Sequence, residues 1–347
     1  MVLDELGTPI VLAPMAGGPS TPELAAAVSE AGGLGFVAAG YLPARELGAR
    51  IKATRALTAR AFGVNLFYPS EPSPTDRFSS YIEELGREFP VGEAKYDSDD
   101  WAAKLELLIA DPVAVVSSTF GCPSAAEIAR LRAVGSEVWV TVTTVAEARQ
   151  AVAAGADVLV AQGAEAGGHR GTFADDPGED LVDPLGTLAL VQLLRAAVDV
   201  PIVAAGGIVS GAAVAGVLAV GAAAAQLGTA FMRCPEAGTS PVIRKAIAGD
   251  TPTMLTRAFT GRRARGLRNR FMEDHPDAPV AYPEIHYATG PLRAAARAAG
   301  NADEVNLWAG QAHSLAVELP AGELVRTLSA DAKNALERAL SLRIQTY

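Results

Sequence analysis

Short apolar runs recur along the chain, and segments with helical spacing separate them. The runs are apolar on both faces and do not alternate with polar residues, which is typical of parallel strands that are covered on both sides. Strand and helix alternate eight times, and this repetition predicts an α/β fold, a (β/α)8 TIM barrel, rather than an open doubly wound sheet. The eight runs lie at 10–13, 34–37, 62–65, 113–116, 138–141, 158–161, 202–205 and 224–227.

The segments between the runs carry recognisable helix starts and helix ends. Residues 20–23 and 143–147 place Ser or Thr ahead of a glutamate, as a helix N-cap requires. Glycine follows the expected helices at Gly32, Gly135 and Gly155, where a left-handed conformation stops a helix. The pattern therefore predicts helices beginning near Leu24 and Ala148, each ending at a glycine.

Two intervals are too long for a minimal strand and helix unit. They are 67–112 and 162–182, and both follow strands. In a barrel they would lie at the C-terminal face, where active sites of this fold form. We expect a barrel over 1–238 with a helical insertion at 67–112. We expect 239–347 to be a mostly helical extension, with no strand series of its own, packed on the barrel.

The composition is that of a globular protein without a polyanionic partner. Half of the 347 residues are hydrophobic, 20% are charged, and the formal net charge is −10. A nucleic-acid binder usually shows a basic face instead. We interpret one basic cluster as a surface that pairs with carboxylates: Arg262, Arg263, Arg265, Arg268 and Arg270. A small-molecule substrate is expected, and no nucleic acid.

Membrane and targeting segments are not expected. Residues 212–227 are apolar but alanine-rich and broken by glycine, and Met1–Glu5 carries no basic residue ahead of an apolar run. Cys122 and Cys234 are too few for a disulfide framework and lack the spacing of a metal site. We expect a cytoplasmic monomer or homodimer with free thiols and no metal.

Paired glycine turns are the strongest chemical signal. Gly206-Gly207 follows the seventh run, and Gly228-Thr229 follows the eighth. In barrels a phosphate commonly lies between these two loops, because glycine lets backbone N–H groups approach its oxygens. Either turn alone is equally well explained as a strand end. Together they favour a ligand that carries a phosphate.

Neutral residues at other strand ends suit a planar, polar heterocycle. Ala13-Pro14-Met15 follows the first run and offers exposed backbone and a thioether, although an ordinary Pro/Gly turn explains it as well. Asn65 ends the third run and Gln162 the sixth. An amide both donates and accepts hydrogen bonds. Each amide is almost equally well explained as a cap on a neighbouring strand.

His169 is the histidine that follows a barrel strand, in the segment Gln162 to Gly171. There it can accept a proton near neutral pH or stabilise an anion when protonated. Taken alone, a histidine in a polar loop is more often a solvated residue. His275, His286 and His313 lie in the extension, and we interpret them as surface or packing residues.

These segments resemble the nitronate monooxygenases, formerly called 2-nitropropane dioxygenases, from about residue 7 to residue 320. The most specific segment is Asp157–Gly171, which is similar to the family's signature around its active-site histidine. The supporting segments are Ala13–Gly18, Gly63–Asn65, Ala204–Ile208, Gln226–Thr229 and, more weakly, Leu307–Gln311.

The resemblance implies an FMN-dependent flavoprotein, an oxidoreductase that uses O2. It would convert alkyl nitronates such as propionate 3-nitronate into a carbonyl product and nitrite or nitrate, with cofactor chemistry that the protein orients. His169 would either deprotonate a neutral nitroalkane or pair with a nitronate. The residues implied for the isoalloxazine are Ala13, Pro14 and Met15, with Asn65, Gln162, Gly167 and Gln226 nearby. Those implied for the phosphate are Gly206, Gly207, Gly228 and Thr229.

The C-terminal part departs from the better-characterised members of that family. Those members carry several tyrosines and a lysine near the site, whereas Tyr282 and Tyr287 are the plausible phenols here. The alternative is a flavin-dependent enoyl-ACP reductase that uses NAD(P)H. Such reductases share the barrel, the FMN loops and a Gly-Gly-His segment.

Overall fold

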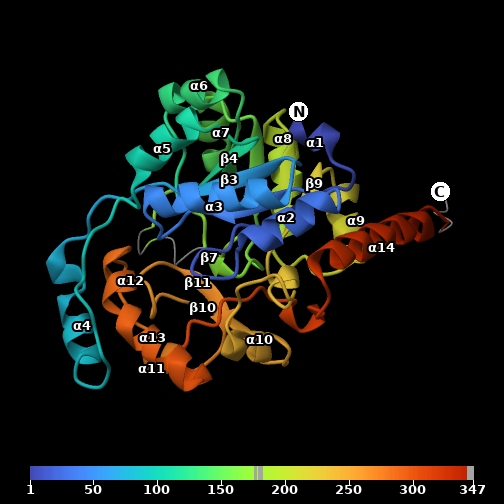
Figure 1. Ribbon diagram of the computed structural model, residues 1–347. Coiled ribbons are helices and arrows are strands. Elements are labelled where there is room, and N and C mark those ends of the chain that lie inside the picture. Colours follow the sequence, from blue (N-terminus) through green and yellow to red (C-terminus); the bar gives the residue numbers. More distant parts are fainter. Residues whose placement is uncertain (176–177, 179–182, 342–347) are drawn as a thin grey trace.

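Eight parallel strands form a barrel in the computed structural model, which describes residues 1–175, 178 and 183–341 (Figure 1). All eight predicted apolar runs contribute to these strands. The residues at 176–177 and 179–182, part of the predicted 162–182 loop, and the tail at 342–347 lie outside the described part. The strands are β1 (Ile10–Leu12), β2 (Gly35–Ala38), β3 (Phe62–Phe67), β4 (Val115–Thr119), β5 (Glu137–Val142), β6 (Val158–Gln162), β8 (Ile202–Ala205) and β9 (Ala224–Leu227).

Backbone hydrogen bonds close the sheet on itself. Its order is β1-β9-β8-β6-β5-β4-β3-β2, and every neighbouring pair is parallel. The first and last strands meet where Leu12 N donates to Leu34 O (2.9 Å) and Leu34 N donates to Ile10 O (3.0 Å). This closure confirms the barrel and excludes an open sheet.

Helices cover the outside of the barrel, and their ends follow the predicted signals. Thr21 Oγ1 accepts from Leu24 N, and Gly32, Gly135 and Gly155 have positive φ angles. The helices up to β9 are α1 (Val2–Glu5), α2 (Pro22–Glu30), α3 (Ala44–Leu57), η1 (Thr75–Arg77), α4 (Ser79–Leu85), α5 (Trp101–Ala110), α6 (Ala125–Ala133), α7 (Val145–Ala154), α8 (Thr187–Ala197) and α9 (Gly211–Ala219). Those after β9 are η3 (Thr229–Phe231), α10 (Pro241–Ile247), α11 (Arg270–Asp274), α12 (Glu284–Ala288), α13 (Gly290–Ala299), η4 (Ala302–Glu304), η5 (His313–Leu315) and α14 (Ala321–Ser341).

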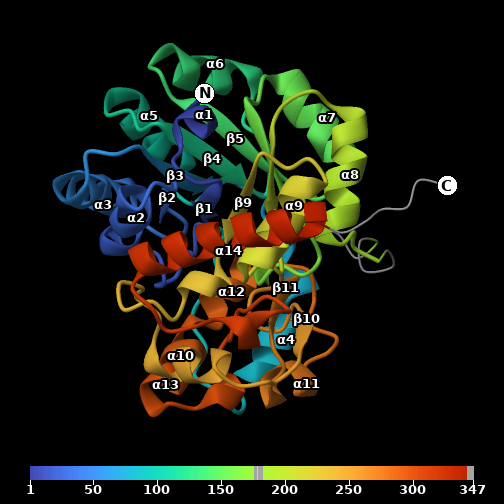
Figure 2. The ribbon, with the colours of Figure 1, turned by 90° about the vertical axis from the view of Figure 1, so that its right-hand side faces the viewer.

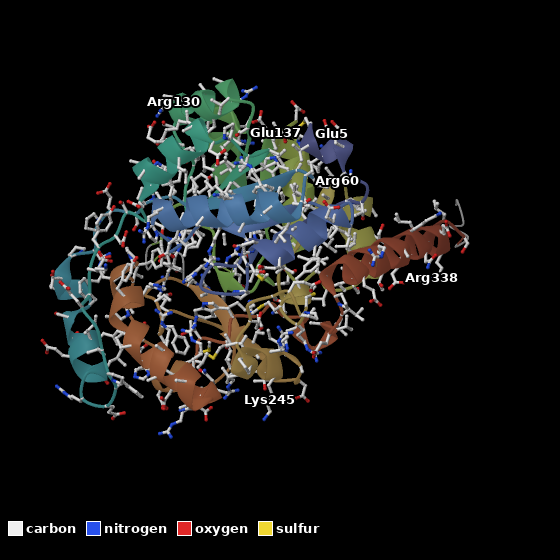
Figure 3. All side chains as sticks on the ribbon, viewed as in Figure 1. Glu5, Arg60, Arg130, Glu137, Lys245 and Arg338 are labelled. Atoms are coloured by element: carbon white, nitrogen blue, oxygen red, sulfur yellow. The ribbon has the colours of Figure 1, made fainter. Side chains whose placement is uncertain are left out.

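Large side chains fill the barrel interior. Trp139 and Phe36 are fully buried there, with ring centroids 5.9 Å apart. Apolar residues of α1 pack against this cluster and close the N-terminal end. Figure 3 shows Glu5 and Glu137 at this end, far from Lys245 of α10. The open end of the barrel is therefore the opposite one, where the strands end.

The insertion and the extension meet beyond that open end. Residues of α4 share a hydrophobic cluster with Phe259, Phe271 and Ile285 of the extension. The phenol of Tyr81 also donates to the carbonyl of Ala258 (2.7 Å). Figure 1 accordingly shows α4 beside α11, α12 and α13, on one side of the barrel. Insertion and extension form a second layer over the strand ends.

The extension contains two strands that the sequence pattern did not predict. They are β10 (Thr253–Thr256) and β11 (Ala264–Leu267), which pair antiparallel. The other edge of β11 pairs with β7 (Gly168–His169), a two-residue strand in the loop after β6. The extension therefore also contains a short antiparallel pair of strands that the sequence pattern did not indicate. Strand β11 depends on a partner about 95 positions earlier, which local patterning does not reveal.

The long C-terminal helix returns to the barrel wall. Helix α14 packs against α9 and α2 (Figure 2), and its buried side includes Leu324, Val325 and Leu328. No helix in the described residues combines the length and the apolar character needed to cross a membrane. Cys122 and Cys234 are free thiols.

Candidate active site

A cavity of about 370 Å³ opens at the carboxyl ends of the barrel strands. Its volume lies within the range of small-molecule sites, roughly 300–1,000 Å³. Every residue that the sequence predicts for catalysis or cofactor binding lies in its wall, whereas Tyr282 and Tyr287 line a separate, smaller pocket. The predicted residues that line the cavity are Ala13, Pro14, Met15, Asn65, Gln162, Gly167, His169, Gly206, Gly207, Gln226, Gly228 and Thr229.

The turn after β1 forms an uncharged side of the cavity. The amide of Met15 donates to Ser20 Oγ (2.8 Å), and the amide of Ser20 donates back to the Met15 carbonyl (3.2 Å). Gly17 and Gly18 have φ angles of 82° and 140°, which favour glycine. The turn therefore holds Pro14 and the thioether of Met15 against the cavity.

The two amide side chains differ in what holds them. Asn65 lies inside β3 rather than at its end, and its Nδ2 donates to Ser117 Oγ (2.9 Å). Gln162 does end β6; its Nε2 donates to the His169 carbonyl (3.0 Å), and its Oε1 accepts from the Gly171 amide (2.8 Å). The side-chain amide of Gln162 therefore fixes the loop that carries His169 and also lines the cavity.

The turn after β8 requires glycine at two consecutive positions. Gly206 and Gly207 have φ angles of 118° and 69°. A Cβ on Gly206 would lie 2.9 Å from Thr187 Oγ1, and one on Gly207 would lie 2.9 Å from Glu165 Cβ. Neither position accepts a side chain, so the cavity meets bare backbone here.

A close backbone contact joins the turn after β9 to the extension. Thr229 Oγ1 accepts a hydrogen bond from the Gly310 amide (3.0 Å). A Cβ on Gly167 would lie 2.5 Å from Gly310 N. The loop after β6, the turn after β9 and the segment around Gly310 therefore meet through their backbones.

His169 is fixed through both its backbone and its ring. Its backbone pairs with Ala264 of β11, and its Nε2 lies 2.9 Å from Thr260 Oγ1. The Thr260 hydroxyl donates to the Arg262 carbonyl (3.3 Å), so the hydroxyl oxygen accepts from Nε2–H of the imidazole. Three aromatic rings have centroids 5.5 to 5.8 Å from that of the imidazole: Phe120, Tyr282 and Trp308.

The imidazole is neutral at neutral pH. Burial, together with the positive charges of Arg262 and Arg293, lowers the pKa of His169 to about 3. With Nε2–H donated to Thr260, Nδ1 is the unprotonated nitrogen. His169 is thus a weak base placed in a positive field.

The basic cluster of the extension is partly internal. Arg262 and Arg265 are buried, and both donate to backbone carbonyls of the loop after β6. Arg268 and Arg270 are exposed and pair with carboxylates of α11. The prediction of a surface cluster is therefore wrong for Arg262 and Arg265, because these two side chains tie the extension to the His169 loop.

His286, which the sequence predicts to be a surface or packing residue, also lines the cavity. Its ring stacks on Tyr41 at 3.9 Å and 5°, and the Tyr282 hydroxyl donates to the Tyr41 hydroxyl (3.0 Å). His275 and His313 do pack, since His275 contacts the Phe271 ring and His313 is buried. No motif in the sequence marks Tyr41 or His286.

Arg293 and Arg297 of α13 also line the cavity, and sequence reasoning missed both. Arg293 is buried, and its Nη2 donates to the His286 carbonyl (2.6 Å). Their spacing of four residues places both on one face of the helix. This four-residue spacing is the feature of the sequence that could have indicated that both arginines face the same site. Among the described residues, no group of three or more His, Cys, Asp and Glu side chains is placed to hold a metal ion.

Known proteins resemble this chain over most of its length. The model of the nitronate monooxygenase family matches residues 2–331. The chain belongs to this family. A nitronate monooxygenase from Pseudomonas aeruginosa is 44% identical over 336 residues, which are 92% of this chain and 95% of that protein.

Solved structures agree with membership of the nitronate monooxygenase family. A crystal structure of nitroalkane oxidase from Streptomyces ansochromogenes has a TM-score of 0.95 and 50% identity, and covers 98% of this chain and 99% of its own. FabK from Thermotoga maritima has a TM-score of 0.75 and 28% identity, with 97% and 96% covered. The predicted family and barrel are confirmed, and the chain is an oxidoreductase.

Proposed function

We propose that this nitronate monooxygenase family member binds FMN and uses O2 to convert alkyl nitronates into carbonyl compounds and nitrite. One observation carries the proposal. The bare glycine turns after β8 and β9 and the neutral imidazole of His169 border the same cavity. A phosphate-bearing cofactor and an anionic substrate can therefore occupy adjoining parts of it.

The residues of the cavity fit FMN. The glycines at 206 and 207 present backbone where a Cβ would collide, as a phosphate cradle needs. Gly228 and Thr229 would complete the cradle. Ala13, Pro14 and Met15 offer an uncharged wall for the isoalloxazine. Asn65, Gln162, Gly167 and Gln226 line the same cavity. Bound FMN supplies the redox chemistry between substrate and O2.

The protonation state of His169 favours a nitronate over a neutral nitroalkane. A base with a pKa of about 3 removes a carbon-bound proton poorly at neutral pH. A nitronate arrives already deprotonated, and its negative charge is attracted by the buried guanidinium of Arg262. The low pKa therefore argues against the deprotonating role for His169. The unprotonated Nδ1 is an acceptor, so the attraction for a nitronate comes from the nearby arginines rather than from the imidazole.

A paired assay tests the proposal. The purified protein should be yellow, should release FMN close to one per chain, and should consume O2 with ethyl nitronate, forming nitrite. The same preparation should not oxidise NADH with an enoyl thioester. A colourless protein that takes up no added FMN would reject the cofactor. Thioester-dependent NADH oxidation without nitronate turnover would instead favour the enoyl-ACP reductase alternative.

A further inference from the structure

The phenol that reaches the cavity belongs to Tyr41, in the loop after β2. Tyr282 and Tyr287, the phenols expected from the sequence, line the smaller pocket, whereas Tyr41 lines both that pocket and the large cavity. The ring of Tyr41 stacks on His286 and meets Phe67 edge-on, with 5.3 Å between ring centroids. The Tyr41 ring therefore forms part of the wall between the two pockets, and other rings fix its orientation.

The hydroxyl of Tyr41 accepts one hydrogen bond and keeps its own proton. The Tyr282 hydroxyl donates to it (3.0 Å). Among the residues that the structure describes, none accepts a hydrogen bond from the Tyr41 hydroxyl. Burial raises the pKa of Tyr41 to about 12, so the phenol stays protonated at neutral pH. A neutral donor is therefore available to a ligand in the cavity.

The contacts of Tyr282 strengthen this donor and place it on the same side of the cavity as His169. The guanidinium carbon of Arg262 lies 5.7 Å from the centre of the Tyr282 ring, and the imidazole of His169 lies 5.5 Å from it. A positive charge over a phenol ring makes its hydroxyl a better donor, and hydrogen bonds in a chain polarise one another. The hydrogen of the Tyr41 hydroxyl should therefore bind an acceptor more strongly than that of an isolated phenol.

The backbone of Tyr41 is held in an unusual conformation by the insertion. Its φ angle is 67°, which is uncommon for a bulky residue. The Tyr41 amide donates to Asp99 Oδ1 (2.6 Å). The fully buried Lys104 donates to Asp99 Oδ2 (2.7 Å) and to the carbonyl of Ala39 (3.0 Å). Burying a lysine is costly even when it is paired, and a strained residue that its surroundings hold in place is typical of functional sites.

Resting on the proposed function, we propose that Tyr41 is a specificity-determining residue that donates its phenolic hydrogen bond to an oxygen of the bound nitronate. No proton is transferred. His169 cannot supply this donor, because its Nε2–H is donated to Thr260 and its Nδ1 is an acceptor. A donor stabilises an anionic oxygen more than a neutral one. Tyr41 therefore favours the nitronate over the neutral nitroalkane.

A binding comparison tests this without turnover. Butyrate copies the nitronate, since a carboxylate is a planar anion with two oxygens, and butyramide is its neutral isostere. In the Tyr41→Phe holoenzyme, calorimetry should find butyrate bound about 10- to 100-fold more weakly than in the unmodified protein. The affinity for butyramide should fall about threefold or less. An unchanged affinity for butyrate, or an equal loss for both ligands, would overturn the inference.

The same readout separates this inference from the proposed function. Neither ligand is oxidised, so the comparison gives its answer even if nitronates are not turned over. If the protein does oxidise nitronates, Tyr41→Phe should lower kcat/KM for propyl-1-nitronate about 10- to 100-fold. Nitronate oxidation by the unmodified protein, with no change in Tyr41→Phe, would overturn the inference and leave the proposed function standing.

Two further variants assign the effect to Tyr41. Tyr282→Phe removes the group that donates to Tyr41 but leaves the Tyr41 proton, so butyrate affinity should fall only about two- to fivefold. A loss in Tyr282→Phe as large as that in Tyr41→Phe would overturn the inference. Tyr96→Phe is the matched control, since Tyr96 lies in the same insertion and its side chain is 39% exposed. This control should leave both affinities unchanged.

The fold of Tyr41→Phe should be retained, because phenylalanine keeps the ring that stacks on His286. A thermal melt checks this. A lower melting temperature with an unchanged preference for butyrate over butyramide would show a purely structural phenol and would also overturn the inference.

Discussion

At the scale of single residues, the neutrality of His169 sets how the enzyme responds to pH. The imidazole has a pKa of about 3 instead of 6.5 because it is buried near Arg262 and Arg293. We expect kcat/KM for a freshly prepared nitronate to show no inflection near pH 6.5. Oxygen uptake measured between pH 6 and 8 tests this. A fall in kcat/KM centred near 6.5 that is absent from His169→Gln would show a normal histidine and contradict the expectation.

The sequence predicts the position of a cavity residue only where that residue follows a barrel strand. Gly206, Gly228 and Gln162 follow apolar runs, so a barrel brings them to one end. Tyr41 and Arg293 reach the same cavity from a loop after β2 and from the extension. Their approach depends on tertiary packing: the four-residue spacing of Arg293 and Arg297 shows that they share a helix face, but not that this face meets the cavity. The site was therefore predictable on the barrel side and not on the extension side.

At the scale of elements, the contact between Gly167 and Gly310 decides whether the His169 loop can pack against the extension. Gly167→Ala should lower the free energy of unfolding by about 1 to 3 kcal/mol, because its Cβ would meet backbone atoms at 2.5 Å. Gly216→Ala in α9 meets nothing within 4 Å and should raise it by about 0.5 to 1 kcal/mol. Urea unfolding of both variants measures the difference. Equal urea midpoints for the two variants would contradict the close approach of Gly167 to Gly310.

The barrel strands were predictable because each is a short apolar run that a neighbouring strand and a helix both cover. Strand β11 reads Ala-Arg-Gly-Leu, and the charge at Arg265 hides it from such a pattern. It is a strand because β7 and β10 satisfy its backbone on both edges. Elements made by long-range pairing escape reasoning from local sequence.

At the scale of the whole molecule, barrel, insertion and extension should unfold together. The β7–β11 pairing, the cluster shared with α4, and the packing of α14 on α9 link them. Far-UV circular dichroism and tryptophan fluorescence should therefore give one urea midpoint. Trp308→Phe leaves Trp101 and Trp139 as reporters outside the extension, and its two curves should also coincide. Separate midpoints would show an independently stable barrel.

The pairing of His169 with Ala264 also has a consequence during synthesis. Translation completes β9 at Leu227 well before it reaches β11. The His169 loop therefore has no strand to pair with until the extension has been synthesised. Because the barrel and the extension fold as one unit, a chain truncated near residue 240 should lack the ordered glycine turns as well as the ordered histidine, so the cavity is completed only after the extension has been synthesised.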